Sequence, residues 1–143
     1  MDDLPPLIAS ETAKDEIYLK IWELEQKHTT TRWTVATFFL SVSFAIFGIS
    51  LQIDNGVIPR IVPQLGAVAI YWFTYVLFLR FNDFTRFLRE YLQELEASKQ
   101  TTLDLQSKSK TFMSANKTFS ATKLFLYFGF GYTVAGVVIG LLY

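Results

Sequence analysis

Residues 33–53 read WTVATFFLSVSFAIFGISLQI, a run of 21 residues without a charged side chain. Two further uncharged, mainly apolar runs cover residues 61–79 and 124–143. An α-helix needs about 20 mainly apolar residues to cross the hydrocarbon core of a bilayer. All Lys, Arg, Asp and Glu residues of the chain lie outside these three runs. The sequence therefore predicts an all-α integral membrane protein with three transmembrane helices.

The segments between the runs predict the organisation of the rest of the chain. We expect a cytoplasmic arm and amphipathic helix at 1–32, transmembrane helices at 33–53, 61–80 and 124–143, an external hairpin at 54–60, and a cytoplasmic helix and linker at 81–123. The hairpin contains Asp54-Asn55-Gly56, which is a strong turn signal. The first residues lack the pattern of a cleaved signal peptide, so we expect the first span to be retained as an anchor.

The distribution of positive charge predicts the orientation, because cytoplasmic loops carry an excess of Lys and Arg. The connection between the first two runs holds one such residue, Arg60, and the other twelve lie before the first run or between the second and third. We therefore expect the N-terminus and the long connection to face the cytoplasm. The hairpin and the C-terminus then face outward, as three spans require.

Apolar residues at helical spacing continue the first two spans into the cytoplasm, which predicts long helical extensions of both. We expect the two extensions to contact each other or neighbouring subunits through Ile17, Ile21, Leu24, Phe84, Leu88, Leu92 and Leu95. The carboxylates of the same helices are expected on solvated faces, namely Glu23, Glu25, Glu94 and Glu96.

Residues 100–122 are rich in Ser, Thr and Lys, which predicts a flexible linker. The alternative is a short interfacial helix on anionic lipid, with Phe112, Met113 and Phe119 among lysines.

Small and polar residues recur at spacings of three and four in the first and third spans. In the first span they are Thr34, Thr37, Ser41, Ala45, Gly48 and Gln52, and in the third Gly129, Thr133, Gly136 and Gly140. Small residues let helices approach closely in lipid, and hydroxyl groups can hydrogen-bond across the contact. Both faces are interpreted as helix-packing surfaces. For the first span, the wall of a water-filled pore in an oligomer is the alternative.

The chain carries no pattern typical of catalysis. It has no cysteine, and its single histidine, His28, is expected to be a surface or packed residue. No nucleotide-binding loop or metalloprotease motif occurs. The spans carry no charge, which argues against ion-coupled transport, and the formal net charge of zero does not indicate nucleic acid as a partner. We predict a protein that is not an enzyme and has no catalytic residue, cofactor or metal site.

The order of elements resembles that of SLATT-type small membrane effectors of bacterial defence systems. The resemblance covers about residues 10–100 and includes the Asp54-Asn55-Gly56 hairpin and the long helix after the second span, through Phe84, Leu88 and Leu92. Aromatic and basic residues lead into the first span, namely Tyr18, Trp22, Lys27, Arg32 and Trp33. The resemblance implies a bacterial inner-membrane protein that oligomerises and breaches the membrane when it senses a nucleotide signal or a partner.

Two functions fit these features. The first is a homo-oligomeric, pore-forming or membrane-perturbing effector driven by its cytoplasmic helices, which receive a nucleotide signal or a cytoplasmic protein. The alternative is a scaffold or anchor subunit of a larger membrane complex, because every span has a packing face and the chain lacks reactive groups. In both cases the lipid bilayer surrounds the spans.

Overall fold

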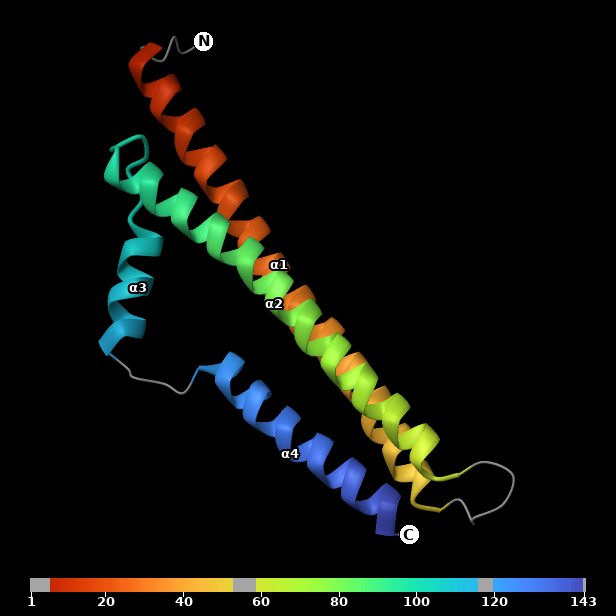
Figure 1. Ribbon diagram of the computed structural model, residues 1–143. Helices are drawn as coiled ribbons and strands as arrows, with labels where there is room; N and C mark the ends of the chain where they lie inside the picture. Colours follow the sequence, from red (N-terminus) through yellow and green to blue (C-terminus); the bar gives the residue numbers. More distant parts are fainter. Residues whose placement is uncertain (1–5, 53–58, 116–119, 143) are drawn as a thin grey trace. The chain divides into compact units, whose positions relative to one another are not determined.

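The computed structural model describes residues 6–52, 59–115 and 120–142, and within these ranges its regular secondary structure is entirely α-helical. The helices are α1 (Pro6–Ser50), α2 (Ile61–Ala97), α3 (Leu105–Ala115) and α4 (Ala121–Leu142) (Figure 1). The all-α prediction is confirmed. The expected hairpin residues Asp54-Asn55-Gly56 lie outside the described residues.

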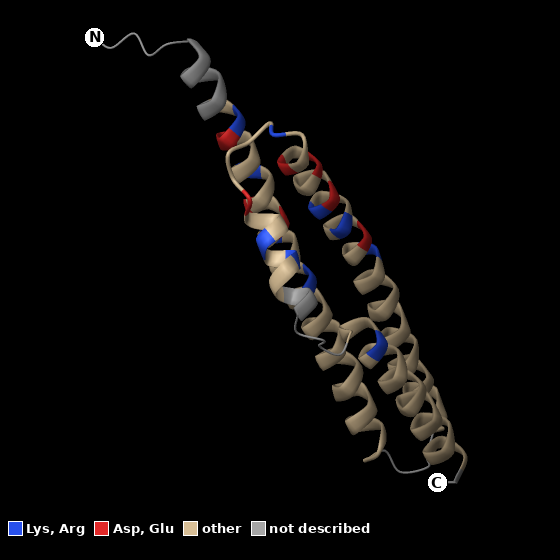
Figure 2. Ribbon diagram, turned by 90° about the vertical axis from the view of Figure 1, so that its left-hand side faces the viewer, with Lys and Arg blue, Asp and Glu red and all other residues tan. Residues whose placement is uncertain are grey.

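Three helices are long and apolar enough to cross a membrane, judged by length and composition. These are the stretch Ala13–Ser50 of α1, all of α2, and Ala121–Leu141 of α4. Figure 2 shows the charged residues mostly on the first part of α1, the last part of α2, and α3. In α1 the apolar stretch follows the charged part of the helix. In α2 the apolar stretch comes first and the charged part follows it.

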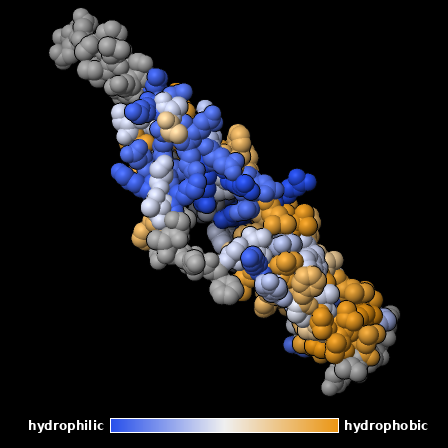
Figure 3. Space-filling model, turned by 60° about the vertical axis from the view of Figure 1, so that its left-hand side comes forward, coloured by the Kyte–Doolittle hydropathy of each residue, from blue (hydrophilic) through white to orange (hydrophobic). Residues whose placement is uncertain are grey.

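The chain forms two compact units. Unit 1 comprises Met1–Thr30 and Phe81–Thr118, and unit 2 comprises Thr31–Arg80 and Phe119–Tyr143. Helices α1 and α2 contribute to both units, whereas α3 belongs to unit 1 and α4 to unit 2. Hydrophilic residues dominate the visible surface of unit 1 and hydrophobic residues that of unit 2 (Figure 3).

In unit 2, the buried residues of α1 and α2 follow a repeat of seven. On α1 they include Ala36, Ser43 and Ser50, and on α2 they are Gln64, Ala67, Tyr71, Thr74 and Phe78. Residues repeating every 3.5 positions stay on one face of a helix that pairs with another at a shallow angle. Tyr132 of α4 packs against Ala67 and Tyr71 and completes the core.

In unit 1, the same spacing buries Tyr18 and Glu25 on α1, and Thr85, Leu88 and Leu92 on α2. The expected contact residues Leu88 and Leu92 lie in this seam, and Ile21 and Leu95 lie at its edge, half-buried. Ile17 and Leu24 are 54 and 43% exposed and lie outside this seam, so their contact with a neighbouring subunit stays a prediction. Phe84 is 42% exposed, and its ring contacts that of His28 on α1 at a centroid distance of 4.5 Å. One residue turns a helix by about 100°, so a seam through Tyr18 and Glu25 carries Ile17 and Leu24 outward.

Helix α2 ends in a Schellman motif centred on Lys99, whose φ of 54° is in the left-handed region. The amide of Gln100 donates to the carbonyl of Leu95, and that of Lys99 to the carbonyl of Glu96, both at 3.1 Å. The chain then turns into α3. Helix α3 covers residues 105–115, so the expectation of a flexible linker over this stretch is wrong. Phe112 lies exposed on α3. Phe119 and the side chain of Met113 are outside the part of the chain that the structure describes.

Candidate functional site: packing faces and carboxylate clusters

The glycine face of α4 packs against α2 within unit 2. A Cβ atom added at Gly129 would lie 2.6 Å from Cε1 of Tyr71, and one at Gly136 would lie 3.2 Å from Cγ2 of Val68. At Gly140 it would collide with side chains from the first turn of α2. The absence of a Cβ atom lets side chains of α2 approach the backbone of α4 this closely. The chain itself therefore occupies this predicted face.

Thr133 belongs to the same face and links α4 to α2 by a hydrogen bond. The indole Nε1 of Trp72 donates to its Oγ1 at 3.0 Å, and the hydroxyl in turn donates to the carbonyl of Gly129 at 2.8 Å. The structure thus brings together all four residues that the sequence placed on this face.

The predicted small and polar face of α1 lies on the surface of unit 2. Its members Thr34, Thr37, Ser41, Ala45 and Gln52 are exposed, and a Cβ atom added at Gly48 would meet nothing within 4 Å. The Ser41 hydroxyl donates to the carbonyl of Thr37 at 2.8 Å, so its proton has a hydrogen-bond acceptor within the helix. We call these six residues the α1 outer face.

The chain packs through a different small face of α1, which was missed from the sequence. The buried Ser43 hydroxyl donates to the carbonyl of Ala67 on α2 at 2.8 Å, and the Tyr132 hydroxyl of α4 donates to the carbonyl of Ser43 at 3.2 Å. The seven-residue spacing of Ala36, Ser43 and Ser50 is the signal that would have identified it.

Gln64 is the exception among the buried polar residues of unit 2. Its side chain is fully buried at the start of α2, and within the described residues neither its Nε2 nor its Oε1 has a hydrogen-bond partner. A buried amide without partners is destabilising, because it loses its hydrogen bonds to water on burial.

Unit 1 contains an ion pair between α1 and α2 in which the carboxylate is buried and the guanidinium is partly exposed. The Nε of Arg89 donates to Oε1 of Glu25 at 2.7 Å, and the side chains are 37 and 1% exposed, respectively. The Glu25 carboxylate also accepts hydrogen bonds from Nε2 of Gln26 at 2.6 Å and from Oγ1 of Thr29 at 3.3 Å. Glu25 is thus buried and paired, which corrects its expected solvated position.

A second carboxylate, Glu96, caps the N-terminus of α3. Its Oε1 accepts hydrogen bonds from the Tyr18 hydroxyl at 2.5 Å and the Gln106 amide at 2.7 Å. Its Oε2 accepts the Ser107 amide at 2.8 Å and the Ser107 hydroxyl. Glu96 therefore joins α1, α2 and α3, and its expected solvated position is wrong.

Burial and these hydrogen bonds shift the pKa values of Glu96 and Tyr18. Burial raises the pKa of Glu96, but the hydrogen bonds from Ser107, Tyr18 and the amide of Gln106 lower it by more, so that it falls below its ordinary value. Burial, followed by the hydrogen bond to Glu96, raises the pKa of Tyr18. Glu96 is therefore ionised and Tyr18 neutral at physiological pH.

Asp15 joins α1 to the turn between α2 and α3. Its carboxylate accepts hydrogen bonds from the Thr101 hydroxyl at 2.6 Å, and from the amide and the hydroxyl of Thr102 at 2.9 and 2.6 Å. These bonds, that from Thr101 first, lower the pKa of Asp15. Three carboxylates thus hold unit 1 together, and sequence reasoning singled out none of them for this role.

His28 packs against the ring of Phe84, with ring centroids 4.5 Å apart. The described residues contain no group of three or more His, Asp or Glu side chains that could hold a metal ion. Comparisons with known proteins find no matching family model, curated protein or solved structure.

Proposed function

We propose that this chain is an integral membrane protein with three transmembrane helices, which assembles into homo-oligomers through the α1 outer face and acts as a pore-forming or membrane-perturbing effector. Unit 1 lies in the cytoplasm and receives the signal. The observation that carries the proposal is the exposure of the α1 outer face, because the glycine face of α4 is already used within the chain.

The surface of unit 2 supports its placement in lipid. Its buried seam consists largely of small and polar residues, whereas many large apolar side chains are exposed, among them Phe38, Phe44, Ile49, Val62, Leu65, Phe73, Val76, Phe128, Phe130 and Val134. Water-soluble proteins rarely expose apolar surface on this scale. In lipid the arrangement is stable, because helices there associate through close packing and hydrogen bonds.

Charge supports the orientation. Unit 1 and its flanking turns hold most of the Lys and Arg residues, and the connection between α1 and α2 holds only Arg60. The excess of positive charge supports a cytoplasmic position of unit 1.

A pore requires several copies of the chain. The interior of unit 2 is filled by Tyr71 and Tyr132, with Phe47 and Phe125 packed against them. A water path must therefore lie between chains, and the α1 outer face is the surface of small and polar residues that can line or seal it.

The test uses two glycines that differ only in location. Gly48 belongs to the α1 outer face and Gly66 to the outer surface of α2, and an added Cβ atom meets nothing within 4 Å at either. We expect Gly48→Leu to lower the assembly mass released from nanodiscs and to abolish ion flux from proteoliposomes, while Gly66→Leu changes neither. A wild-type monomer, or equal effects of both variants, would contradict the proposal.

The alternative is a scaffold or anchor subunit of a larger membrane complex. It is favoured by the exposed apolar residues of unit 1, among them Ile17, Leu24 and Phe87. Crosslinking in native membranes would then join the chain to a second polypeptide at a fixed ratio. Recovery of this chain alone would reject the scaffold function.

A further inference from the structure

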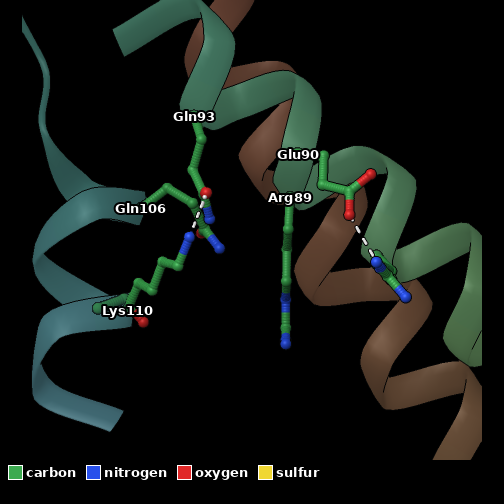
Figure 4. A pocket seen from close by; sticks show the side chains of 7 residues that line it. Arg89, Glu90, Gln93, Gln106 and Lys110 are labelled. Carbon is green, nitrogen blue, oxygen red and sulfur yellow. Dashed lines mark hydrogen bonds and ion pairs between the residues drawn. The ribbon is translucent and has the colours of Figure 1, made fainter. Parts of the chain in front are cut away.

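Unit 1 has a cavity of about 410 Å³ between α2 and α3. Arg86, Arg89 and Gln93 line it from α2, and Gln106 and Lys110 line it from α3. Figure 4 shows the side chains of Gln93, Gln106 and Lys110 converging from the two helices, with Arg89 extending into the space beside them. The volume is within the range of small-molecule sites, which is about 300–1,000 Å³.

The lining carries three cationic side chains and a single carboxylate, Glu90. Arg86 holds that carboxylate through an ion pair of 2.8 Å on the same helix. Arg89 uses its Nε for Glu25, so the two terminal amino groups of its guanidinium remain as donors. The ammonium of Lys110 donates to Oε1 of Gln93 at 3.0 Å and has two further protons to donate.

Gln106 adds a neutral donor to the cationic lining. The residue is only 7% exposed, and its backbone amide is taken by Glu96 and Tyr18. Its side chain lines the cavity beside Lys110 (Figure 4). A side-chain amide in a cationic cavity is suited to donate to an anionic oxygen.

We infer that this cavity binds a phosphate group, with Lys110 supplying positive charge and the terminal amino groups of Arg89 and the side-chain amide of Gln106 donating to its oxygens. The guanidinium fork matches the geometry of phosphate oxygens, and a lysine supplies a second point charge. The phosphate belongs either to a soluble phosphorylated molecule or to a phospholipid headgroup. This site does not depend on the oligomer proposed above.

The test uses the full chain in phosphatidylcholine nanodiscs. Inorganic pyrophosphate titrated by calorimetry probes the soluble source, and native mass spectrometry of nanodiscs that also contain phosphatidic acid probes the headgroup. Lys110→Gln removes one cation of the cavity. Lys108→Gln is the matched control, because Lys108 has the same charge, lies on the same helix and does not line this cavity. Arg86→Gln is a second test variant, and circular dichroism checks the folding of all three.

We expect one pyrophosphate, or one retained phosphatidic acid, per chain, and a loss of affinity of about tenfold in Lys110→Gln, the usual contribution of a charge-assisted hydrogen bond. Lys108→Gln should change the affinity by less than about twofold, because Lys108 is exposed to solvent, which screens its charge, and does not line the cavity. Binding of pyrophosphate identifies a soluble ligand, and selective retention of phosphatidic acid identifies a headgroup. Failure of both probes to bind, or equal losses in both lysine variants, would overturn the site.

Discussion

Replacing Glu96 by Gln should weaken the attachment of α3 to α1 and α2. The wild-type carboxylate accepts two backbone amides of the first turn of α3, the Ser107 hydroxyl and the Tyr18 hydroxyl. The amide of Gln keeps one acceptor oxygen, turns the other position into a donor, and removes the negative charge at the helix N-terminus. Hydrogen bonds to a charged group contribute about 1.5–3 kcal/mol each, and a helix N-cap about 1 kcal/mol.

We therefore expect the closed state of α3 to lose about 2–3 kcal/mol. Since 1.4 kcal/mol corresponds to a factor of ten, the amides of α3 should exchange roughly 30–150 times faster. Hydrogen exchange followed by mass spectrometry, on the full chain in nanodiscs, measures this directly. Glu94→Gln is the matched control, because Glu94 is exposed on the same helix and the same atoms change.

The pH dependence of exchange gives a second check. Because the pKa of Glu96 is lowered in the folded protein, its contribution to stability is fully present above the unfolded value, about 4.5, and is lost as the pH falls through the folded value. Wild-type protection of α3, corrected for intrinsic exchange, should be constant above pH 5 and weaken only below about pH 4.5. Unchanged exchange in Glu96→Gln, or equal acceleration in Glu94→Gln, would refute the capping role.

Three further predictions concern stability, measured by chemical unfolding in detergent. Gln64→Met should stabilise unit 2 by about 1–2 kcal/mol, because it removes a buried amide that has no partner among the described residues, and a loss of stability would show that the amide is bonded in the folded protein. Lys99→Gly should stabilise the end of α2 by about 1 kcal/mol, because glycine adopts a φ of 54° without strain, whereas Lys99→Ala should give no such gain. Arg89→Ala should cost about 3–5 kcal/mol, because it leaves Glu25 buried and unpaired, and adding Glu25→Leu should recover most of the loss if burial of that charge is the cause.

The helical class and the candidate spans were predictable because they depend on local properties of the sequence. An uncharged run of about 20 residues is long enough to cross a bilayer whatever surrounds it. The glycine face of α4 was also visible, since Gly129, Gly136 and Gly140 lie on one side of a helix at any packing angle.

The carboxylate clusters were not predictable from local pattern. Glu25 and Glu96 alternate with apolar residues on amphipathic helices, where a carboxylate is normally solvated. Their partners are remote: Arg89 is 64 positions from Glu25, and Tyr18 is 78 positions from Glu96. Helix α3 was anticipated only as the alternative to a flexible linker, because the group that caps its amides lies at the end of α2, outside the local pattern of residues 105–115.

By itself the sequence determined where the helices run and which segments avoid charge, because backbone hydrogen bonding and apolar length are properties of each segment alone. It left two small faces on α1, one through Ser41 and Gly48 and the other through Ser43 and Ser50, and both permit close packing. Only the tertiary structure decided between them, because the hydroxyl of Ser43 meets the carbonyl of Ala67 across the seam with α2. The face through Ser41 and Gly48 is consequently the one that lies on the surface of unit 2.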